Sequence, residues 1–339
     1  MRLWKCLTVC SLLAGIGCQQ EAGIIDGLEK TGAAVARGLD GSPKSVRFGS
    51  STISVDAVEQ LKQLATLQEV HGNASSLNDE QTAALLGLPK LTAVSLQDSG
   101  AAAASIGQIS ASATLRDVDL SGAEGCTDEV LAGLADQVHL RVLKLDGTPL
   151  TDASAEVLGS LSSLEELSLL DTGFTVAGIQ QLAEALPELK SLSVRSADID
   201  DSALAVIAGM KNLESLTLSG CPLNGSSLGE LAALKSLRLL RLADCPNLTN
   251  DGVLALGALE VLEELDVSGS QFSGTGFNQS GFRKLSTLLA NETQVTNEQV
   301  GDFTGTPVLY SVQVHGTPVT EEGVRKHFAP TSQTNWAWD

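Results

Sequence analysis

Apolar residues recur along this chain in one pattern, L-x-x-L-x-L, in which x is mostly polar. Because the side chains of a strand alternate between its two faces, the last two apolar positions of each copy share one face of a short predicted strand. Successive copies begin 23 to 25 residues apart, and a fixed period of this length predicts a repeat array. Clear copies begin at Leu91, Leu115, Leu140, Leu164, Leu189, Leu213, Leu237 and Leu262, and weaker copies at Pro43, Leu67, Leu285 and Leu309.

A column of small residues follows each predicted strand. It lies three residues after the last apolar position, where a turn leaving a buried strand has room only for a small side chain. Hydroxyl or thiol groups there can satisfy loop backbone groups. The column reads Ser51, Ser75, Ser99, Ala123, Thr148, Thr172, Ala197, Cys221, Cys245, Ser270, Thr293 and Thr317.

A column of helix-capping residues comes next, each after one apolar residue. Its members are Ser54, Asn78, Thr127, Thr151, Thr175, Asp200, Asn224, Thr249, Ser273, Thr296 and Thr320. All belong to the types whose side-chain oxygen accepts an N–H of the first helical turn. Each repeat is therefore predicted to run strand, tight turn, capped short helix, return loop.

The pattern resembles the leucine-rich repeat in its bacterial form, and it is similar to the cysteine-containing subtype of F-box adaptors. The best copies are LRVLKLDGTPLTD at 140–152 and LRLLRLADCPNLT at 237–249. The resemblance covers residues 43–328 and implies an α/β solenoid, or horseshoe, of about 12 strand-turn-helix repeats with a parallel sheet on the concave face. No F-box-like segment accompanies it.

The two ends lie outside the repeat. Residues 18–42 are predicted to form a tether and an N-terminal capping helix, because Ile24, Ile25 and Leu28 lie at near-helical spacing and solenoids need caps. The C-terminal tail, residues 329–339, contains Trp336 and Trp338. These rings shield the last repeat or form an exposed docking stripe, or the tail is disordered.

The first residues resemble a targeting segment. Residues 1–17 combine Arg2 and Lys5 with an apolar run of about 11 residues, which is too short to span a bilayer and fits a signal peptide. Small residues before Cys18 resemble a bacterial lipobox, which implies lipidation of that cysteine, although Gly15 stands where Leu is usual. Ordinary cleavage with secretion, or an uncleaved anchor, are the alternatives. Gln19 after the cysteine favours the outer membrane for a lipoprotein of this kind.

Charge and residue content narrow the possible functions. The 339 residues carry a formal charge of -20 and a pI near 4.5, which argues against nucleic acid as a partner. No protease, hydrolase or phosphate-loop signature is present, and the four histidines are scattered, so we expect no enzyme, no cofactor and no metal. Cys126, Cys221 and Cys245 lack metal spacing and fit structural core positions.

The binding surface is predicted from the strand pattern. Residues between and after the last two leucines point away from the core, and these two columns carry a net charge of +1. The charged candidates from Asp119 onward are Asp119, Lys144, Asp146, Arg195, Arg241 and Asp266. One hypothesis is that Lys144, Arg195 and Arg241 bind an anionic or carboxylate-bearing partner. The alternative is a solvated polar sheet without a specific ligand.

These observations favour a non-catalytic, exported protein of the cell envelope that is lipid-anchored, most simply to the outer membrane, and binds another protein through its concave face. A periplasmic or secreted location is the alternative. Two other functions stay open: a self-associating structural component of the envelope, and a surface recognition or virulence factor that binds a host protein or glycan.

Overall fold

The computed structural model describes residues 20–73, 77–98, 107–110, 112–136, 139–328 and 334–338. Its contacts divide the chain into two compact units, residues 1–143 (unit 1) and residues 144–339 (unit 2). Cys18 and the predicted signal peptide lie outside the described residues.

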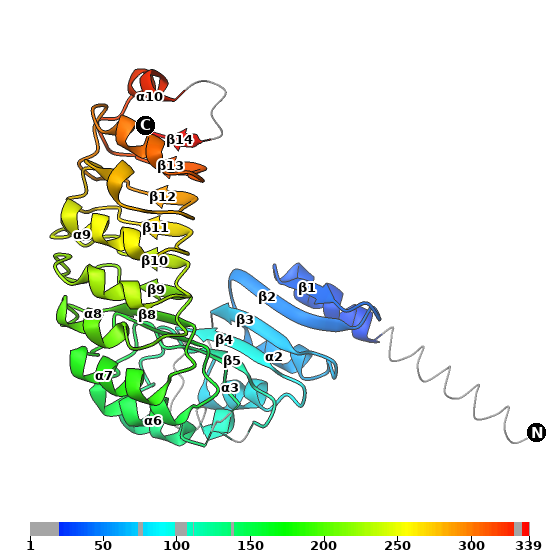
Figure 1. Ribbon diagram of the computed structural model, residues 1–339. Helices are drawn as coiled ribbons and strands as arrows, with labels where there is room; N and C mark the ends of the chain where they lie inside the picture. The colour runs from blue at the N-terminus through cyan, green and yellow to red at the C-terminus, as the bar shows by residue number, and fades with distance from the viewer. Residues whose placement is uncertain are drawn as a thin grey trace, which may run out of the picture. The chain divides into compact units, whose positions relative to one another are not determined.

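Unit 1 alternates strands with short helices in the order that the repeat predicts (Figure 1). Its first element is a helix at residues 20–30. The others are β1 (Ala34–Arg37), β2 (Pro43–Thr52), α2 (Val55–Leu61), β3 (Glu69–Asn73), α3 (Asp79–Leu86), β4 (Ala93–Gln97), a helical turn at residues 107–110, β5 (Asp117–Asp119), α5 (Asp128–Leu131) and η1 (Ala132–Leu134), and β6 (Val142–Lys144) lies at the boundary.

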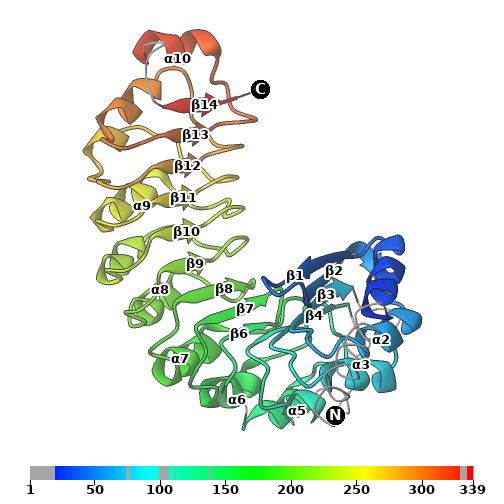
Figure 2. The same ribbon diagram turned by 90° about the vertical axis from the view of Figure 1, so that its right-hand side faces the viewer.

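Unit 2 repeats the same order. Its elements are η2 (Asp152–Ser154), α6 (Ala155–Ser160), β7 (Glu166–Leu170), α7 (Val176–Ala185), β8 (Ser191–Arg195), α8 (Ser202–Ile207), β9 (Ser215–Thr217), η3 (Leu228–Ala233), β10 (Leu239–Arg241), α9 (Asn250–Ala255), η4 (Leu256–Ala258), β11 (Glu264–Asp266), η5 (Phe277–Gln279), β12 (Thr287–Leu289), η6 (Val300–Gly305), β13 (Ser311–Gln313), α10 (Glu321–His327) and β14 (Asn335–Ala337). Figure 2 shows strands β8 to β13 stacked along one side of this unit, with α8 and α9 on the other.

The repeat strands are parallel and in register. In unit 1, Val46 pairs with Val70, Val70 with Val94, and Val94 with Val118. In unit 2 the same column continues as Leu192, Leu216, Leu240, Leu265, Leu288 and Val312. Each of these side chains is buried, so the second apolar position of the motif builds the core as predicted. The twelve strands from β2 to β13 stand at the twelve predicted positions.

The small column is a ladder of turn contacts. The hydroxyls of Ser270 and Thr293 donate to the carbonyl oxygens of Val267 and Ala290, three residues earlier, at 2.6 and 2.7 Å. The thiol of Cys245 lies 3.4 Å from the carbonyl oxygen of Leu218 in the preceding repeat. These groups therefore satisfy backbone acceptors where the chain leaves the core.

The caps agree with the sequence in some repeats and differ in others. Side-chain oxygens of the predicted caps accept a first-turn N–H at Ser54, Asn78, Thr127, Thr151, Thr175, Thr249 and Thr320. The N-cap residue of α8 is Asp201, one residue later than predicted, but Asp200 Oδ1 still accepts the N–H of Ser202 at 2.9 Å. After Asn224 and Ser273 only a 3₁₀ turn forms, further along the chain, because Gly225 and Gly274 have positive φ. Thr296 Oγ1 accepts the N–H of Glu298 at 3.3 Å, and its hydroxyl donates to Gln299 Oε1 at 2.7 Å, although a 3₁₀ helix rather than an α-helix follows.

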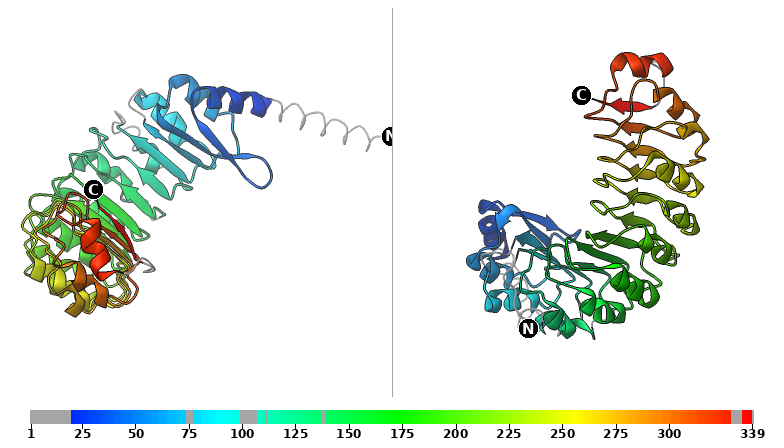
Figure 3. Two further views of the ribbon diagram at one scale, coloured as in Figure 1. Left: turned by 90° about the horizontal axis from the view of Figure 1, so that it is seen from above. Right: turned by 90° about the vertical axis from the view of Figure 1, so that its left-hand side faces the viewer.

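The N-terminal segment contains a strand that the helical spacing did not predict. The helix at 20–30 buries Ile25 and Leu28, but it ends before Gly32, which has a φ of 90°. β1 then pairs antiparallel with β2, and the left view of Figure 3 shows the two strands as a hairpin. A glycine in the left-handed region ends the helix and returns the chain to the sheet.

The C-terminal tail adds a strand to the last repeat. β14 pairs parallel with β13, placing Trp336 beside Val312. The Trp336 ring lies edge-on to Phe303 and Phe328, with centroids 5.6 and 5.2 Å apart. This arrangement supports the shielding role that the sequence suggested for Trp336.

Candidate functional site

The face of each sheet that points away from the helices presents three side chains per repeat, and we call it the sheet face. In β11 and the two residues after it, Glu264, Asp266 and Ser268 reach solvent, whereas Leu265 and Val267 between them are buried. The repeat therefore exposes one more column than the two predicted. The missed column is the residue just before the second leucine of the motif.

The missed column is acidic. It contributes four carboxylates to the sheet faces, from Glu69, Asp117, Glu166 and Glu264, and it contributes no base. With these four carboxylates included, the net formal charge of the side chains on the sheet faces changes from +1 to -3. Strict alternation of side chains along a strand was the signal that could have revealed them.

The three predicted cations of unit 2 have carboxylates beside them. Lys144 Nζ lies 3.1 Å from Glu166 Oε1, in the next repeat, and Arg241 Nη2 lies 2.9 Å from Glu264 Oε1. Arg195 Nη1 lies 3.4 Å from Asp171 Oδ2, at the turn after the preceding strand. Both partners in each pair are substantially exposed, so the pairs stabilise the fold only weakly. A carboxylate from a binding partner would therefore have to compete with the chain's own carboxylate for each of these three cations.

The three predicted acids accept hydrogen bonds within the chain. Asp146 Oδ1 accepts from the hydroxyl of Ser168 at 2.6 Å and from the N–H of Leu170 at 2.9 Å. Asp266 Oδ1 accepts from the N–H of Ser268 at 3.0 Å. In the described part of unit 2, no hydrogen bond or ion pair joins any two of the five predicted residues there, so they form a dispersed surface.

Asp119, the predicted residue in unit 1, is held by neutral donors. Its Oδ2 accepts from Ser95 Oγ at 3.0 Å and Gln97 Nε2 at 3.1 Å, and its Oδ1 accepts from the N–H of Ser121 at 3.0 Å. On the same face, burial and the charge of Arg47 lower the pKa of His71, although Glu69 and Asp119 oppose the shift. His71 is therefore mainly neutral at neutral pH.

The three cysteines are structural rather than exposed nucleophiles. Cys126, Cys221 and Cys245 are free and buried. Burial raises the pKa of the Cys126 thiol to about 12 and that of Cys245 to about 11, and it also raises the pKa of Cys221. A thiol held protonated in this way is a poor nucleophile and a poor metal ligand.

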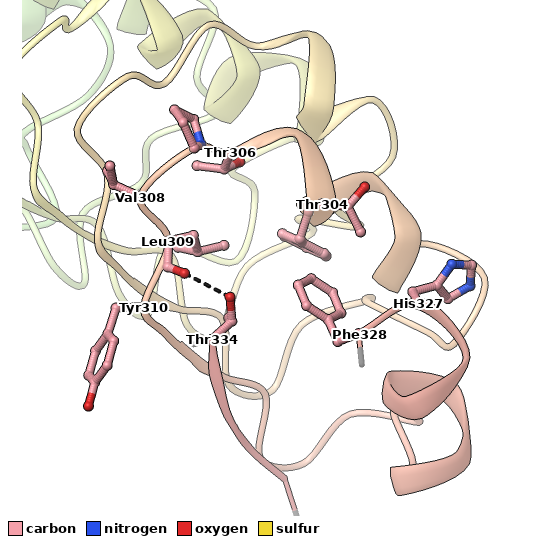
Figure 4. A pocket seen from close by; sticks show the side chains of 10 residues that line it. Thr304, Thr306, Val308, Leu309, Tyr310, His327, Phe328 and Thr334 are labelled. Carbon is pink, nitrogen blue, oxygen red and sulfur yellow. Dashed lines mark hydrogen bonds between the residues drawn. The ribbon is translucent and has the colours of Figure 1, made fainter. Parts of the chain in front are cut away.

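A pocket of about 510 Å³ lies at the C-terminal end of unit 2. Figure 4 shows Leu309 and Phe328 at its wall, with His327 at its rim and a 2.8 Å hydrogen bond from the hydroxyl of Thr334 to the Leu309 carbonyl. Residues 329–333, which run between two of its lining residues, lie outside the described part of the chain. We therefore assign no ligand to it.

Metal-binding clusters and membrane-spanning helices are both absent from the described residues. Within those ranges, no three His, Cys, Asp or Glu side chains gather closely enough to hold a metal ion. None of the helices in them is both long and apolar enough to cross a membrane.

Comparison with known proteins identifies the repeat. A family model described as leucine-rich repeat region matches residues 93–299. No curated protein matches the chain by sequence. Among solved structures, an internalin from Listeria monocytogenes has 17% identity and a TM-score of 0.58, over 94% of this chain and 93% of that one.

Two further structures share the fold at the same low identity. One is from the yeast complex of Rad7 and Elc1, with 17% identity and a TM-score of 0.54, over 84% of this chain and 83% of that one. The other is from the TLR13–ssRNA13 complex, with 17% identity and a TM-score of 0.56, over 88% of this chain and 51% of that one. Identities at this level carry information about fold alone. Because the family model covers more than half of the residues and twelve strands stand at the repeat positions, the chain belongs to the leucine-rich repeat family.

Proposed function

We propose that this chain is a non-catalytic, exported protein that binds another protein through its sheet faces. The observation that carries the proposal is the three columns of side chains on the repeat strands, which point away from the core and are mostly polar. Such a surface offers many separate hydrogen-bonding and charged groups and suits a large partner better than a small molecule. A related fold in yeast is seen with a protein, Elc1.

Nucleic acid is a less suitable partner, although the TLR13 structure is that of a complex with RNA. The whole chain carries a formal charge of -20, and the acidic column makes the sheet positions negative in sum. Phosphate backbones bind mainly through basic groups, so this surface would repel them.

Photocrosslinking from two positions tests the proposal. A photoreactive amino acid at Ser193, on β8, should capture a protein from the native envelope, whereas the same group at Gln181, exposed on α7, should not. Capture from Gln181 alone would place the interface on the helices and contradict the proposal. Absence of any partner from a series of sheet-face positions would favour a structural role in the envelope.

The six predicted charged residues are proposed to lie in this interface. In unit 2 each of the three cations is already paired with a carboxylate of the chain. We therefore expect each of them to bind the partner by exchanging that ion pair for one with a partner carboxylate. The double change Lys144→Glu with Arg241→Glu tests whether they bind an anionic partner. Unchanged binding to the captured protein would assign these side chains to the solvated polar surface instead.

Export and lipidation form a separate part of the proposal. Arg2, Lys5, the apolar run and the small residues before Cys18 support a signal peptide and a lipid on that cysteine. The anchoring membrane would be the outer one, because Gln19 rather than Asp follows. Metabolic labelling with palmitate should mark the protein, and Cys18→Ser should abolish the label. An unlabelled, soluble mature protein would instead support secretion or a periplasmic location.

A further inference from the structure

Four polar side chains form one straight row across the sheet face of unit 1. Arg47 on β2 stands opposite His71 on β3, His71 opposite Ser95 on β4, and Ser95 opposite Asp119 on β5. Residues that pair directly on neighbouring strands share a face of the sheet. We call these four residues the charged row.

The two charges at the ends of the row have no partner of opposite sign. Arg47 is exposed, and no carboxylate of the described residues pairs with it. Asp119 accepts from three neutral donors, and within the same ranges no Lys, Arg or His forms an ion pair with it. This differs from unit 2, where Lys144, Arg195 and Arg241 each lie beside an acid.

Polar groups without hydrogen bonds lie in the charged row and beside it. Nε2 of His71 is shielded from solvent and has no hydrogen-bond partner, its closest acid being Glu69 at 3.6 Å. Ser45, which precedes Arg47 by two residues on the same face, is 7% exposed, and its hydroxyl is also unpartnered. Buried polar groups are nearly always hydrogen-bonded, so two such groups beside an unpaired cation mark a place where a ligand can supply partners.

Strand geometry sets the distance between the two end charges. Neighbouring strands lie about 4.8 Å apart, so three intervals separate Arg47 from Asp119 by about 14 Å. An extended peptide advances about 3.4 Å per residue, so about four residues cover that distance.

We propose that the charged row binds an extended peptide segment of a protein partner, with a carboxylate side chain over Arg47 and a basic side chain over Asp119, about four residues apart. The segment crosses the strands, and the His71 ring and the Ser45 hydroxyl turn outward to hydrogen-bond with its backbone groups. A neutral glycan would leave both charges unpaired, and a nucleic acid carries no cation for Asp119. This inference rests on the proposed function and specifies the partner's chemistry.

A peptide array tests the spacing and the signs together. The probes are acetylated, amidated peptides that hold two charged residues separated by one to six Gly, Ser or Thr residues, in the combinations Glu/Lys, Glu/Glu and Lys/Lys. The protein used is residues 19–339, which retains every described element. We expect strongest retention on Glu/Lys probes with about three intervening residues. Two exposed ion pairs favour them over the like-charged probes by roughly threefold to tenfold at low salt, and 0.5 M NaCl removes the preference.

Charge reversal should change the preference instead of merely weakening binding. Arg47→Glu makes both ends of the row acidic and should shift the preference to Lys/Lys probes, while Asp119→Lys should shift it to Glu/Glu probes. A misfolded variant would lose all binding and could not produce these opposite shifts. Lys62→Glu, at the C-cap of α2, and Asp56→Lys, within α2, make the same charge changes in the same unit and should leave the preference unchanged.

The outcome is separable from that of the proposed function. If crosslinking from the sheet face captures a protein but Arg47→Glu and Asp119→Lys leave the probe preference unchanged, the charged row is not the recognition site and the binding function stands. A preference for one charge sign that ignores spacing would also overturn the inference. If no sheet-face position captures a protein, the proposed function fails whatever the array shows.

Discussion

Asp152 and Thr175 join the starts of two successive helices in unit 2. Asp152 Oδ1 accepts from the N–H of Thr175 at 2.9 Å, and its Oδ2 accepts from the Thr175 hydroxyl. Asn297 makes the same link to Thr320, with Oδ1 2.8 Å from the N–H and Nδ2 3.0 Å from the hydroxyl oxygen. The residue after a cap therefore acts sideways, holding the next repeat's cap in place.

Replacing Asp152 by Ala should destabilise unit 2. The change leaves the N–H and hydroxyl of Thr175 without their acceptor, and hydrogen bonds to a charged group contribute about 1.5–3 kcal/mol. We expect a loss of about 2 kcal/mol in the free energy of unfolding, measured by urea denaturation. Asp251→Ala removes an exposed carboxylate from the first turn of α9 and should change stability by less than about 0.5 kcal/mol. Equal effects of the two changes would refute the sideways link.

A glycine near each link should resist substitution. A β-carbon on Gly178 would overlap the carboxylate of Asp152, and one on Gly323 would overlap the amide of Asn297. We expect Gly178→Ala to destabilise the parent protein by about 1–3 kcal/mol and to cost less when Asp152 is already Ala. A double-mutant cycle in urea measures this coupling. Strictly additive effects would mean that the carboxylate is not what excludes the β-carbon.

The register of the core can be tested at two paired leucines. Leu216 on β9 and Leu240 on β10 occupy paired positions on neighbouring parallel strands. Both side chains are 0% exposed, as the motif predicted. Either Leu→Ala change leaves a cavity inside a closely packed layer and should lower the free energy of unfolding by about 2–5 kcal/mol. Leu39, fully exposed between β1 and β2, provides the control, since Leu39→Ala should have little effect. A loss below about 1 kcal/mol for both core changes would be inconsistent with this packing.

Alkaline pH should destabilise the protein through its buried thiols. Folding raises the pKa of Cys126 from 9.0 to about 12 because burial disfavours the thiolate. The stabilisation is therefore complete below pH 9 and is lost as pH rises from 9 towards 12, since only the unfolded chain readily releases the proton. The slope should approach about 1.4 kcal/mol per pH unit for this thiol. Cys126→Ala should remove that part of the slope, because the two proteins share every other ionisable group. Identical slopes above pH 9 would contradict the assignment.

The sequence predicted the strands well because their signal is local and repeated. Leu216 and Leu240 could be assigned to the core from spacing alone, since a slip of one residue would turn every leucine in the motif to solvent. The capping column was less reliable, because Asn224 and Ser273 have suitable side chains but precede glycines whose positive φ delays the helix. At these two positions the residue type matches the N-cap preference, but the backbone conformation of the next residue determines whether a helix starts there.

The candidate site was harder to predict because its chemistry depends on contacts between repeats. Lys144 was correctly recognised as a non-core residue, yet its ion pair with Glu166 joins residues 22 positions apart in different strands. Arg47 holds the same motif position, and Glu69 follows it by the same 22 residues, but Glu69 Oε2 lies 3.6 Å from His71 Nε2 and forms no ion pair with Arg47. Whether a charge is free for a partner therefore depends on which side chains pair across neighbouring strands, which the sequence of one repeat does not contain.

The tail provides a test of how the array ends. Trp336 packs on Phe303 and Phe328, and the Ala337 carbonyl accepts from the N–H of Val314 at 2.8 Å. Trp336→Ala should loosen β14 and weaken local protection of the last repeat by about 2 kcal/mol, so the Val314 amide should exchange about 30-fold faster. For Trp338 the described residues show no ring contact, and Trp338→Ala should change this exchange by less than about threefold.

The same variants separate shielding from self-association. If Trp336 only covers the end of the array, the protein should have the same molar mass by light scattering with and without the two tryptophans, because the ring contacts lie within one chain. An oligomer that dissociates when Trp336 and Trp338 are removed would instead make the tail an interface between copies and support the structural function in the envelope. Unchanged exchange at Val314 in Trp336→Ala would contradict the shielding role, since the β13–β14 pairing would then not depend on the ring.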